Sequence, residues 1–409
     1  MPVFEYKARD RAGKVIAATM EAGSQREVAA SLREKGYFVS EIKSPRRGLN
    51  TDIKLPTWLD PTSRPGVRDV TVFSRQFATV INAGLPVVQS LSILQRQTEK
   101  QGFKDALKKI REDVETGLPL SDAMAKYPGI FNKLYIYLVK AGEVSGNLDG
   151  ILERVAAYLE KQAELRGKIR TALTYPTVVL IIAIAVTFFL LTGIVPQFAT
   201  ILDQLGGELP IITRVLIGVS DFLRNLWWLL LLVIIGTVIG LRLWYRTDNG
   251  RHALDRLALR IPVFGVLIQK TAIANFSSTF GLLLRSGVNI LESLEITKGA
   301  ARNAIVEDIL QETKESVQRG EQISVTLMKY PRVFPPLVSS MTAIGEETGA
   351  VDSMMQKIAQ FYEREVDEAV ASLTAALEPA LIVFLGVIVG FIVAGMFLPM
   401  FSIIGQLSS

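Results

Sequence analysis

The chain has 409 residues with a net charge of +5, so it exceeds one average domain of about 150 residues and lacks the basic excess of a nucleic-acid-binding protein. It contains no cysteine and one histidine, His252, which excludes disulfides, thiolate metal sites and zinc motifs that use two histidines. Mean hydropathy is +0.31 and 21% of residues are charged, against about 25% in soluble proteins, so part of the chain is expected to lie in lipid.

The first segment, residues 1–45, is predicted to be a small α+β module. Residues 4–8 alternate apolar and polar, residues 10–13 indicate a turn, and residues 14–21 are expected to be extended. Ser24 and Glu27 form a capping box for a helix over 26–35, and a strand over 37–42 follows Gly36. No apolar signal-peptide core precedes the module, so its N-terminus is expected in the cytoplasm. Four prolines, at positions 45, 56, 61 and 65, indicate that residues 46–66 form a linker.

Residues 67–172 are predicted to form a first cytoplasmic bundle of about six antiparallel helices. Val70, Phe73, Phe77 and Val80 share one helical face. Glycines and prolines separate this helix from short ones that follow. The last helix, 148–170, leads toward a membrane span and is expected to be interrupted near Pro176.

Three uncharged apolar stretches are long enough to cross a bilayer, which takes about 20 helical residues. They lie within residues 173–195, 223–241 and 376–400. Basic residues gather before the first stretch and after the second: Lys161, Arg166, Lys168, Arg170, Arg242, Arg246, Arg251, Arg256 and Arg260. Because such residues favour the cytoplasmic side, residues 196–222 are predicted to be a periplasmic loop and 242–269 a cytoplasmic connector. The third span then leaves a periplasmic tail, 401–409.

The two halves of the chain are related by duplication at a constant offset of 203 residues. Lys126-Tyr127-Pro128 matches Lys329-Tyr330-Pro331, and Pro176 matches Pro379. Residues 270–375 are therefore expected to form a second bundle like the first, followed by the third span. The span at 223–241 lies between the repeats and has no counterpart.

Each repeat contains the turn sequence G-E-x-x-G. Its residues are Gly142, Glu143 and Gly146 in the first repeat and Gly345, Glu346 and Gly349 in the second. We expect a glycine at a helix end, a hydroxyl that caps the next helix, and Asp149 or Asp352 in its first turn. The glutamate could accept backbone N–H groups or pair with Arg75. The turn either fixes how two helices cross or contributes to a contact with a partner protein.

Two pairs of glycines in the spans have the spacing that lets helices approach closely. They are Gly236 with Gly240 and Gly386 with Gly390. We hypothesise that Gly386 and Gly390 face another helix, in this chain or in a second copy.

Catalytic motifs are missing from the sequence. There is no phosphate-binding G-x-x-x-x-G-K-[ST] loop and no G-x-S-x-G turn, and His252 is interpreted as an interfacial side chain rather than a base. We therefore expect no enzymatic activity and no cofactor or metal.

The motifs together resemble one family. The motifs of this chain that carry the resemblance are Phe4-x-Tyr6-x-Ala8, the segment from Phe73-x-Arg75-Gln76 to Leu85-Pro86, both G-E-x-x-G turns, and Leu398-Pro399-Met400-Phe401. The chain resembles, over its whole length, the inner-membrane platform proteins of type IV pili and type II secretion, the PilC/GspF family. Residues 85–89 and 361–367 are similar to the pilus branch.

The resemblance implies a non-catalytic role in the bacterial inner membrane. It implies contacts with a hexameric cytoplasmic ATPase, with pilin or pseudopilin subunits and with other inner-membrane assembly proteins, and a homo-oligomeric state. Coupling of ATP-driven motion to pilin insertion and extraction is the implied function. A type II secretion platform is the alternative within the family. A small transporter or channel subunit is the alternative from another class, although such proteins usually carry ionisable residues within their spans.

Overall fold

The computed structural model describes residues 3–9, 15–34, 36–43, 65–204, 210–262, 264–301 and 303–407. It divides the chain into two units, residues 1–63 and 64–409, which are described separately below. The expected turn at 10–13 and nearly all of the linker at 46–66 lie outside the described residues.

The N-terminal unit is the predicted α+β module. It comprises β1 (Val3–Arg9), β2 (Val15–Glu21), α1 (Gln25–Glu34) and β3 (Phe38–Lys43), and the antiparallel sheet has the order β2-β1-β3. Val28 and Leu32 of α1 form its small core with Ala22. The Glu27 N–H donates to Ser24 Oγ at 3.4 Å, while the Glu27 carboxylate accepts the N–H of Gly23, one residue before the expected partner.

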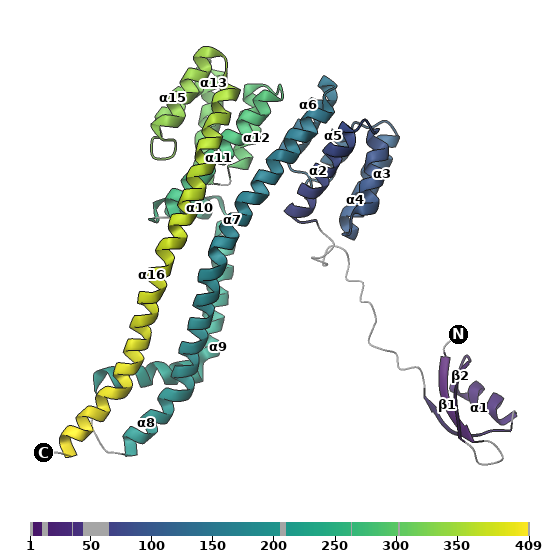
Figure 1. The fold of residues 1–409 in the computed structure, drawn as a ribbon, viewed down its shortest axis with the longest axis vertical. Coiled ribbons are helices and arrows are strands. Elements are labelled where there is room, and N and C mark those ends of the chain that lie inside the picture. Colours follow the sequence, from purple (N-terminus) through teal and green to yellow (C-terminus); the bar gives the residue numbers. More distant parts are fainter. Residues whose placement is uncertain are drawn as a thin grey trace. The chain divides into compact units, whose positions relative to one another are not determined.

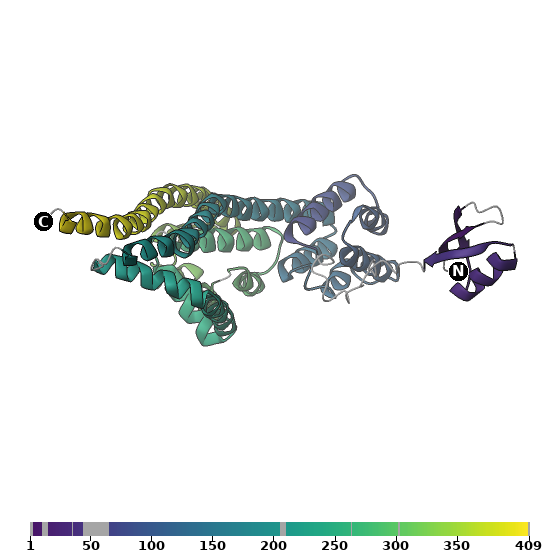
Figure 2. The ribbon, with the colours of Figure 1, turned by 90° about the horizontal axis from the view of Figure 1, so that it is seen from below.

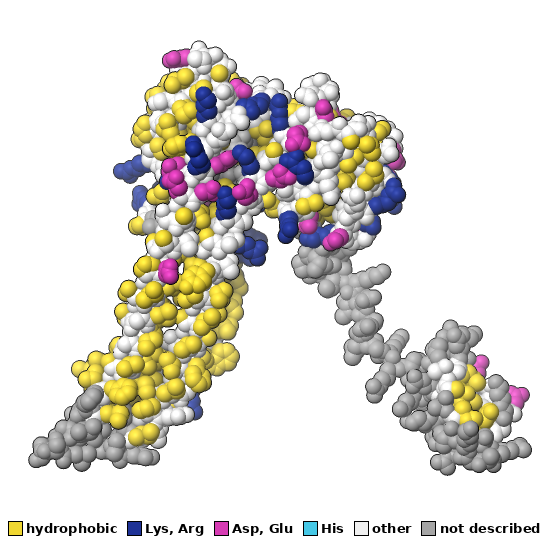
Figure 3. All heavy atoms as spheres, viewed as in Figure 1, with side chains coloured by type: hydrophobic (Ala, Val, Ile, Leu, Met, Phe, Trp, Pro, Cys, Tyr) yellow, Lys and Arg dark blue, Asp and Glu magenta, His cyan; other side chains and the backbone are white. Residues whose placement is uncertain are grey.

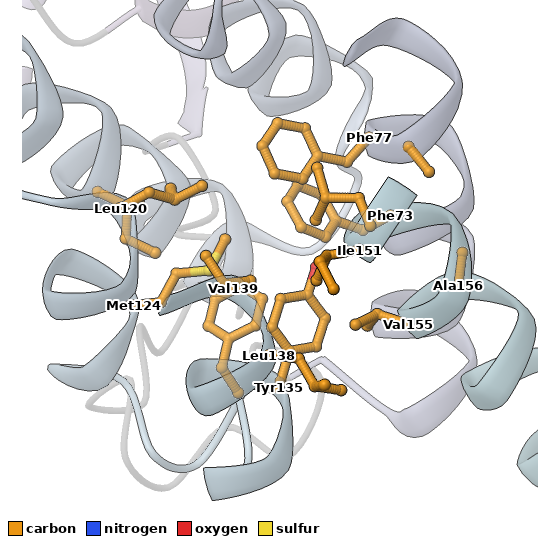
Figure 4. Packing of buried hydrophobic residues seen from close by; sticks show 14 of the residues in the cluster. Phe73, Phe77, Leu120, Met124, Tyr135, Leu138, Val139, Ile151, Val155 and Ala156 are labelled. Atoms are coloured by element: carbon orange, nitrogen blue, oxygen red, sulfur yellow. The ribbon is translucent and has the colours of Figure 1, made fainter. Parts of the chain in front are cut away.

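The first repeat bundle contains five short helices and the beginning of a long one (Figure 1). They are α2 (Val67–Asn82), α3 (Val87–Gln97), α4 (Gln101–Glu115), α5 (Leu120–Ala125), α6 (Lys133–Ser145) and α7 (Leu148–Phe189). The expected stripe on α2 is confirmed, because Phe73 and Phe77 are 3% and 0% exposed and stack at 5.5 Å. Figure 4 shows these rings meeting Tyr135 of α6 and Val155 of α7 in one apolar core.

The second repeat bundle has the same order of helices. It comprises α11 (Phe264–Arg285), α12 (Ile290–Ala300), α13 (Ala304–Gln318), α14 (Ile323–Met328), α15 (Pro336–Thr348) and the start of α16 (Val351–Leu407). Phe276 and Phe280 stack at 5.6 Å and occupy the places of Phe73 and Phe77. A preceding helix, α10 (Asp248–Arg260), joins this bundle to the membrane part.

The long helices α7 and α16 continue from the bundles into the apolar part of the chain. The expected interruption near Pro176 is wrong: α7 runs through Pro176 and α16 runs through Pro379. A proline leaves one carbonyl of the preceding turn without its backbone donor. Just before Pro176, Ala172 and Leu173 pack in an apolar cluster with Val370 and Leu373 of α16, so tertiary packing holds the helix where the proline removes a backbone hydrogen bond.

Among the described residues, three helical segments are long and apolar enough to cross a membrane: Leu148–Ile201, Ile211–Tyr245 and Val351–Met400. Figure 3 shows their exposed side chains as a continuous apolar surface below the charged surface of the bundles. The segment 196–222, expected to be a loop, is helical over most of its described length. The π-helical turn η1 (Leu190–Ile194) and α8 (Val195–Gln204) extend α7, and α9 (Ile211–Tyr245) begins well before the predicted span.

Hydrogen bonds between helices hold one end of this membrane part together. Ser220 of α9 donates to the Leu191 carbonyl at 2.5 Å, where the π-helical turn changes the bonding pattern of the helix. Thr213 of α9 donates to the Gly395 carbonyl at 2.7 Å. Non-helical backbone at Leu226 then bends α9, and Figure 2 shows its second part diverging from α7 and α16.

Candidate functional site

The first G-E-x-x-G turn is built around the carboxylate of Glu143. This side chain on α6 accepts the backbone N–H groups of Leu120 at 2.5 Å and Ser121 at 3.1 Å. These are the first residues of α5, whose N-terminal N–H groups have no partner within their own helix. Pro119 stands at the cap position and offers no side-chain acceptor, so Glu143 caps α5 from a different helix.

The second turn repeats this geometry. Glu346 on α15 accepts the N–H groups of Ile323 at 2.5 Å and Ser324 at 3.0 Å, at the start of α14. Donors and acceptor are all displaced by 203 residues from those of the first repeat. The duplicated glutamate is therefore a tertiary cap, which was one of the two geometries that the sequence left open.

The glycines of each turn have two separate physical roles. Gly146 and Gly349 end α6 and α15 with φ of 69°, a left-handed conformation that favours glycine. Gly142 and Gly345 lie within the helices where the next helix passes. A Cβ on Gly142 would lie 3.2 Å from Leu148 Cα, and one on Gly345 would lie 2.9 Å from Val351 Cα.

Two expectations about these turns are wrong. Arg75 does not pair with Glu143; it binds Glu153 and Glu160 of α7, both at 2.5 Å. The hydroxyls of Ser145 and Thr348 donate to carbonyls of their own helices rather than capping the next one. Asp149 and Asp352 do lie in the first turns of α7 and α16, as expected.

The arginine also marks a difference between the repeats. The hydrogen bond from Arg75 lowers the pKa of the Glu160 carboxyl below its ordinary value. In the second repeat the arginine position is Ser278, and the equivalent of Glu160 is Glu363. Glu363 pairs instead with Lys161 of α7 at 3.1 Å, so a contact within the first repeat is replaced by a contact between the repeats.

A third tertiary cap was not predicted from the sequence. Asp255 of α10 is 8% exposed and accepts the N–H of Ala304, the first residue of α13, at 2.7 Å. Nearby, His252 bonds the Asp248 carbonyl at 2.7 Å and the Asp308 carboxylate at 2.9 Å, so it joins α10 to α13. No spacing in the sequence relates Asp255 to a helix start 49 residues later.

The paired glycines in the spans face no helix among the described residues of this chain. Nothing lies within 4 Å of the position that a Cβ would take on Gly236, Gly240, Gly386 or Gly390. Of the two alternatives for Gly386 and Gly390, contact with a helix of the same chain is not observed among the described residues, and contact with a second copy stays a prediction. Close packing occurs at Gly395, where a Cβ would lie 2.8 Å from Leu216 of α9.

Family comparison agrees with the duplicated architecture. The model of type II secretion system protein F matches residues 73–196 and again 276–399, and its N-terminal domain matches residues 1–43. The chain belongs to this family, the PilC/GspF family of inner-membrane proteins. The two matches are displaced by 203 residues, which confirms the offset found in the sequence.

Individual relatives cover nearly the whole chain. It is 56% identical to the type IV pilus assembly protein PilC of Thermus thermophilus, over 100% of both chains. It is 39% identical to PilC of Myxococcus xanthus, over 99% of this chain and 95% of that one. It is also 37% identical to the type II secretion system protein F of Xanthomonas campestris, over 98% and 99%.

Removing a tertiary cap is expected to lower stability. Glu143→Ala or Glu346→Ala leaves two helix N–H groups without an acceptor, so the free energy of unfolding should fall by about 1–3 kcal/mol. Thermal unfolding of the purified chain in detergent measures this. Glu347→Ala, at an exposed neighbouring position, is the control and should change little. Equal effects of Glu346→Ala and Glu347→Ala would contradict the cap.

Proposed function

We propose that this chain is the platform protein of a type IV pilus assembly machine in the inner membrane. In this role it couples a hexameric cytoplasmic ATPase to the insertion and extraction of pilin subunits, without catalysing a reaction itself. The observation that carries the proposal is the continuity of α7 and α16 from the bundles through the membrane spans. A helix without a break transmits displacement of a bundle to the span below it.

The identity of 56% to a protein named for type IV pilus assembly supports the pilus role. The identity of 37% to a type II secretion protein F favours the equivalent secretion platform as a second candidate. Deletion of the gene distinguishes the two candidate functions. Loss of surface pili with normal protein export supports the pilus platform, and loss of export with normal pili supports the secretion platform.

The proposed topology places both bundles in the cytoplasm and the junction of α8 and α9 in the periplasm. The basic residues around the first two spans support it. Because the chain has no cysteine, single cysteines give a clean measurement. Asp203→Cys should react with a membrane-impermeant thiol reagent in intact cells, while Lys100→Cys and Lys314→Cys should react only after lysis. Labelling at position 314 before lysis would contradict the topology.

The proposed contact with the ATPase is the outer surface of the first G-E-x-x-G turn. The turn directly precedes α7, whose first residue, Leu148, lies 28 residues before Pro176, or about 42 Å along the helix, so the turn is at the end of the bundle far from the span (Figure 1). The Glu143 carboxylate is engaged inside the bundle, whereas the adjacent Val144 is 83% exposed. An exposed apolar side chain on a rigid turn suits a protein contact.

Val144→Asp is expected to weaken ATPase binding and leave the melting temperature unchanged, because this side chain supports no core. Binding of the purified full chain in detergent to the ATPase hexamer measures the first effect, and thermal unfolding the second. Val72→Asp, at a valine that is 48% exposed on α2, is the matched control. Unchanged affinity for Val144→Asp would rule out this turn as the contact.

The proposed contact for pilin is an apolar groove between the spans. It is lined from α7, α9 and α16, including Ala183, Thr187, Trp227, Ile234 and Phe384. Its walls meet near Leu191 and separate where α9 bends away, so the groove is open toward lipid. The apolar helix of a membrane subunit matches the chemistry of this lining.

Filling the groove is expected to impair pilus assembly. Ala183→Trp places a large ring in the groove, whereas Ile182→Trp places one on the neighbouring face, where Ile182 is 58% exposed. Counting surface pili in cells with equal amounts of each variant checks this. Normal piliation with Ala183→Trp would contradict a role for the groove.

A further inference from the structure

The two repeat bundles contact each other through unlike surfaces. On the first bundle, α6 and α7 carry Leu134, Leu138 and Ile151, which are 5%, 1% and 3% exposed and belong to an apolar core that includes residues of the second bundle. We call this the receiving face. The second bundle uses Leu283 and Ile296, which belong to the same apolar core as those residues, and α12 lies against α6. We call this second surface the inserting face.

Polar contacts from α7 accompany the apolar ones. Tyr158 and Thr279 share a hydrogen bond of 3.0 Å between their hydroxyls. Arg154 donates to the carbonyl of Arg285 at 3.0 Å. Lys161, as described above, pairs with Glu363. The receiving face therefore consists of three apolar residues, one tyrosine and two basic residues.

Duplication gives the second bundle a receiving face of its own. At an offset of 203 residues, each apolar residue is matched by an apolar one, the tyrosine by phenylalanine, and both basic residues by basic ones. In chain order the counterparts are Leu337, Met341, Met354, Lys357, Phe361 and Arg364.

No described part of residues 64–409 covers this second receiving face. Leu337 is 41% exposed, against 5% for Leu134, and Phe361 is 37% exposed. Lys357 and Arg364 are exposed and have no acidic partner within 4 Å among the described side chains. Because both bundles have the same helices in the same order, the difference arises from the absence of a neighbouring bundle.

The inserting face of the first bundle lacks a partner in the same way. Val80 and Ile93 are the counterparts of Leu283 and Ile296. They are half-buried, whereas Leu283 and Ile296 are 0% and 5% exposed. Each chain thus presents one uncovered face of each kind, and the two faces match those already joined within the chain.

One position in the spans shows the same asymmetry. Ala183 and Leu191 of α7 are 8% and 7% exposed because α9 and α16 lie beside them. Their counterparts on α16 are Gly386 and Ala394. Gly386 is exposed, with space for a neighbouring helix, whereas Ala394 is half-buried.

We infer that the second receiving face binds the inserting face of the first bundle in a second copy of this chain. The contact repeats, between copies, the one that joins the two bundles within a chain. Because the contact joins two different faces, one from each copy, the copies associate head-to-tail. If the rotation from one copy to the next closes on itself, they form a ring. The spans permit this, because α7 and α16 lie side by side and run in the same direction from the bundles (Figure 1).

Cross-linking between differently tagged copies tests the contact. One copy carries Leu337→Cys and the other Ile93→Cys, both in an otherwise cysteine-free chain. Treatment of membranes with a short bis-maleimide should give a product with both tags. The equivalent pair within one chain, Leu134→Cys with Ile296→Cys, is the positive control. Phe361→Asp, added to the Leu337→Cys copy, should abolish the product and leave the melting temperature unchanged, because this ring is 37% exposed and lies outside the core of the second bundle.

Random collision is measured by replacing the Ile93→Cys copy with a Lys109→Cys copy, since Lys109 on α4 is exposed but lies outside the inserting face. The inference would be overturned if the product with both tags were no more abundant for positions 93 and 337 than for positions 109 and 337. Attachment of position 337 to a different protein, with no doubly tagged product, would overturn it as well.

Discussion

The structure depends on two helices that belong to two environments at once. The first turns of α7 and α16 pack in the aromatic cores of the bundles, and their later turns are apolar enough for a bilayer. Neither bundle can therefore tilt or turn without moving the span that continues from it. The other features of the fold either fix the upper ends of these helices or determine what surrounds their lower ends.

The upper ends are fixed by the duplicated turns. A left-handed glycine ends the preceding helix, a second glycine lets the two helices approach, and a glutamate caps a third helix. Three helices are thus held at one point by backbone geometry and one carboxylate. Such a junction is rigid because each glutamate oxygen meets a helix N–H that has no partner in its own helix. The glutamates are thereby occupied inside the bundles, which leaves other residues of the turns for contacts with partners.

Sequence reasoning succeeded where the signal is local or repeated. The periodicity of Phe73 and Phe77, the three apolar stretches and the offset of 203 residues are such signals. It failed at Pro176, because the helix there is held by packing against α16, a tertiary contact that local sequence does not predict. It also failed at 196–222, where moderate hydropathy conceals helices that are fixed by Thr213 and Ser220. The helix cap by Asp255, and the pairing of Arg75 with Glu153 and Glu160, depend on tertiary contacts that sequence spacing does not predict.

The central claim, that α7 is one rigid helix from bundle to span, is tested most directly by a distance across Pro176. Spin labels on Glu164→Cys and Ile182→Cys, both exposed, are separated by 18 residues, or five turns, so they lie on one face about 27 Å apart along a continuous helix. Electron–electron double resonance on the chain in lipid nanodiscs should give a single narrow distribution near this distance. A broad distribution, or two distances, would mean that the helix bends at Pro176 and would contradict rigid coupling between bundle and span.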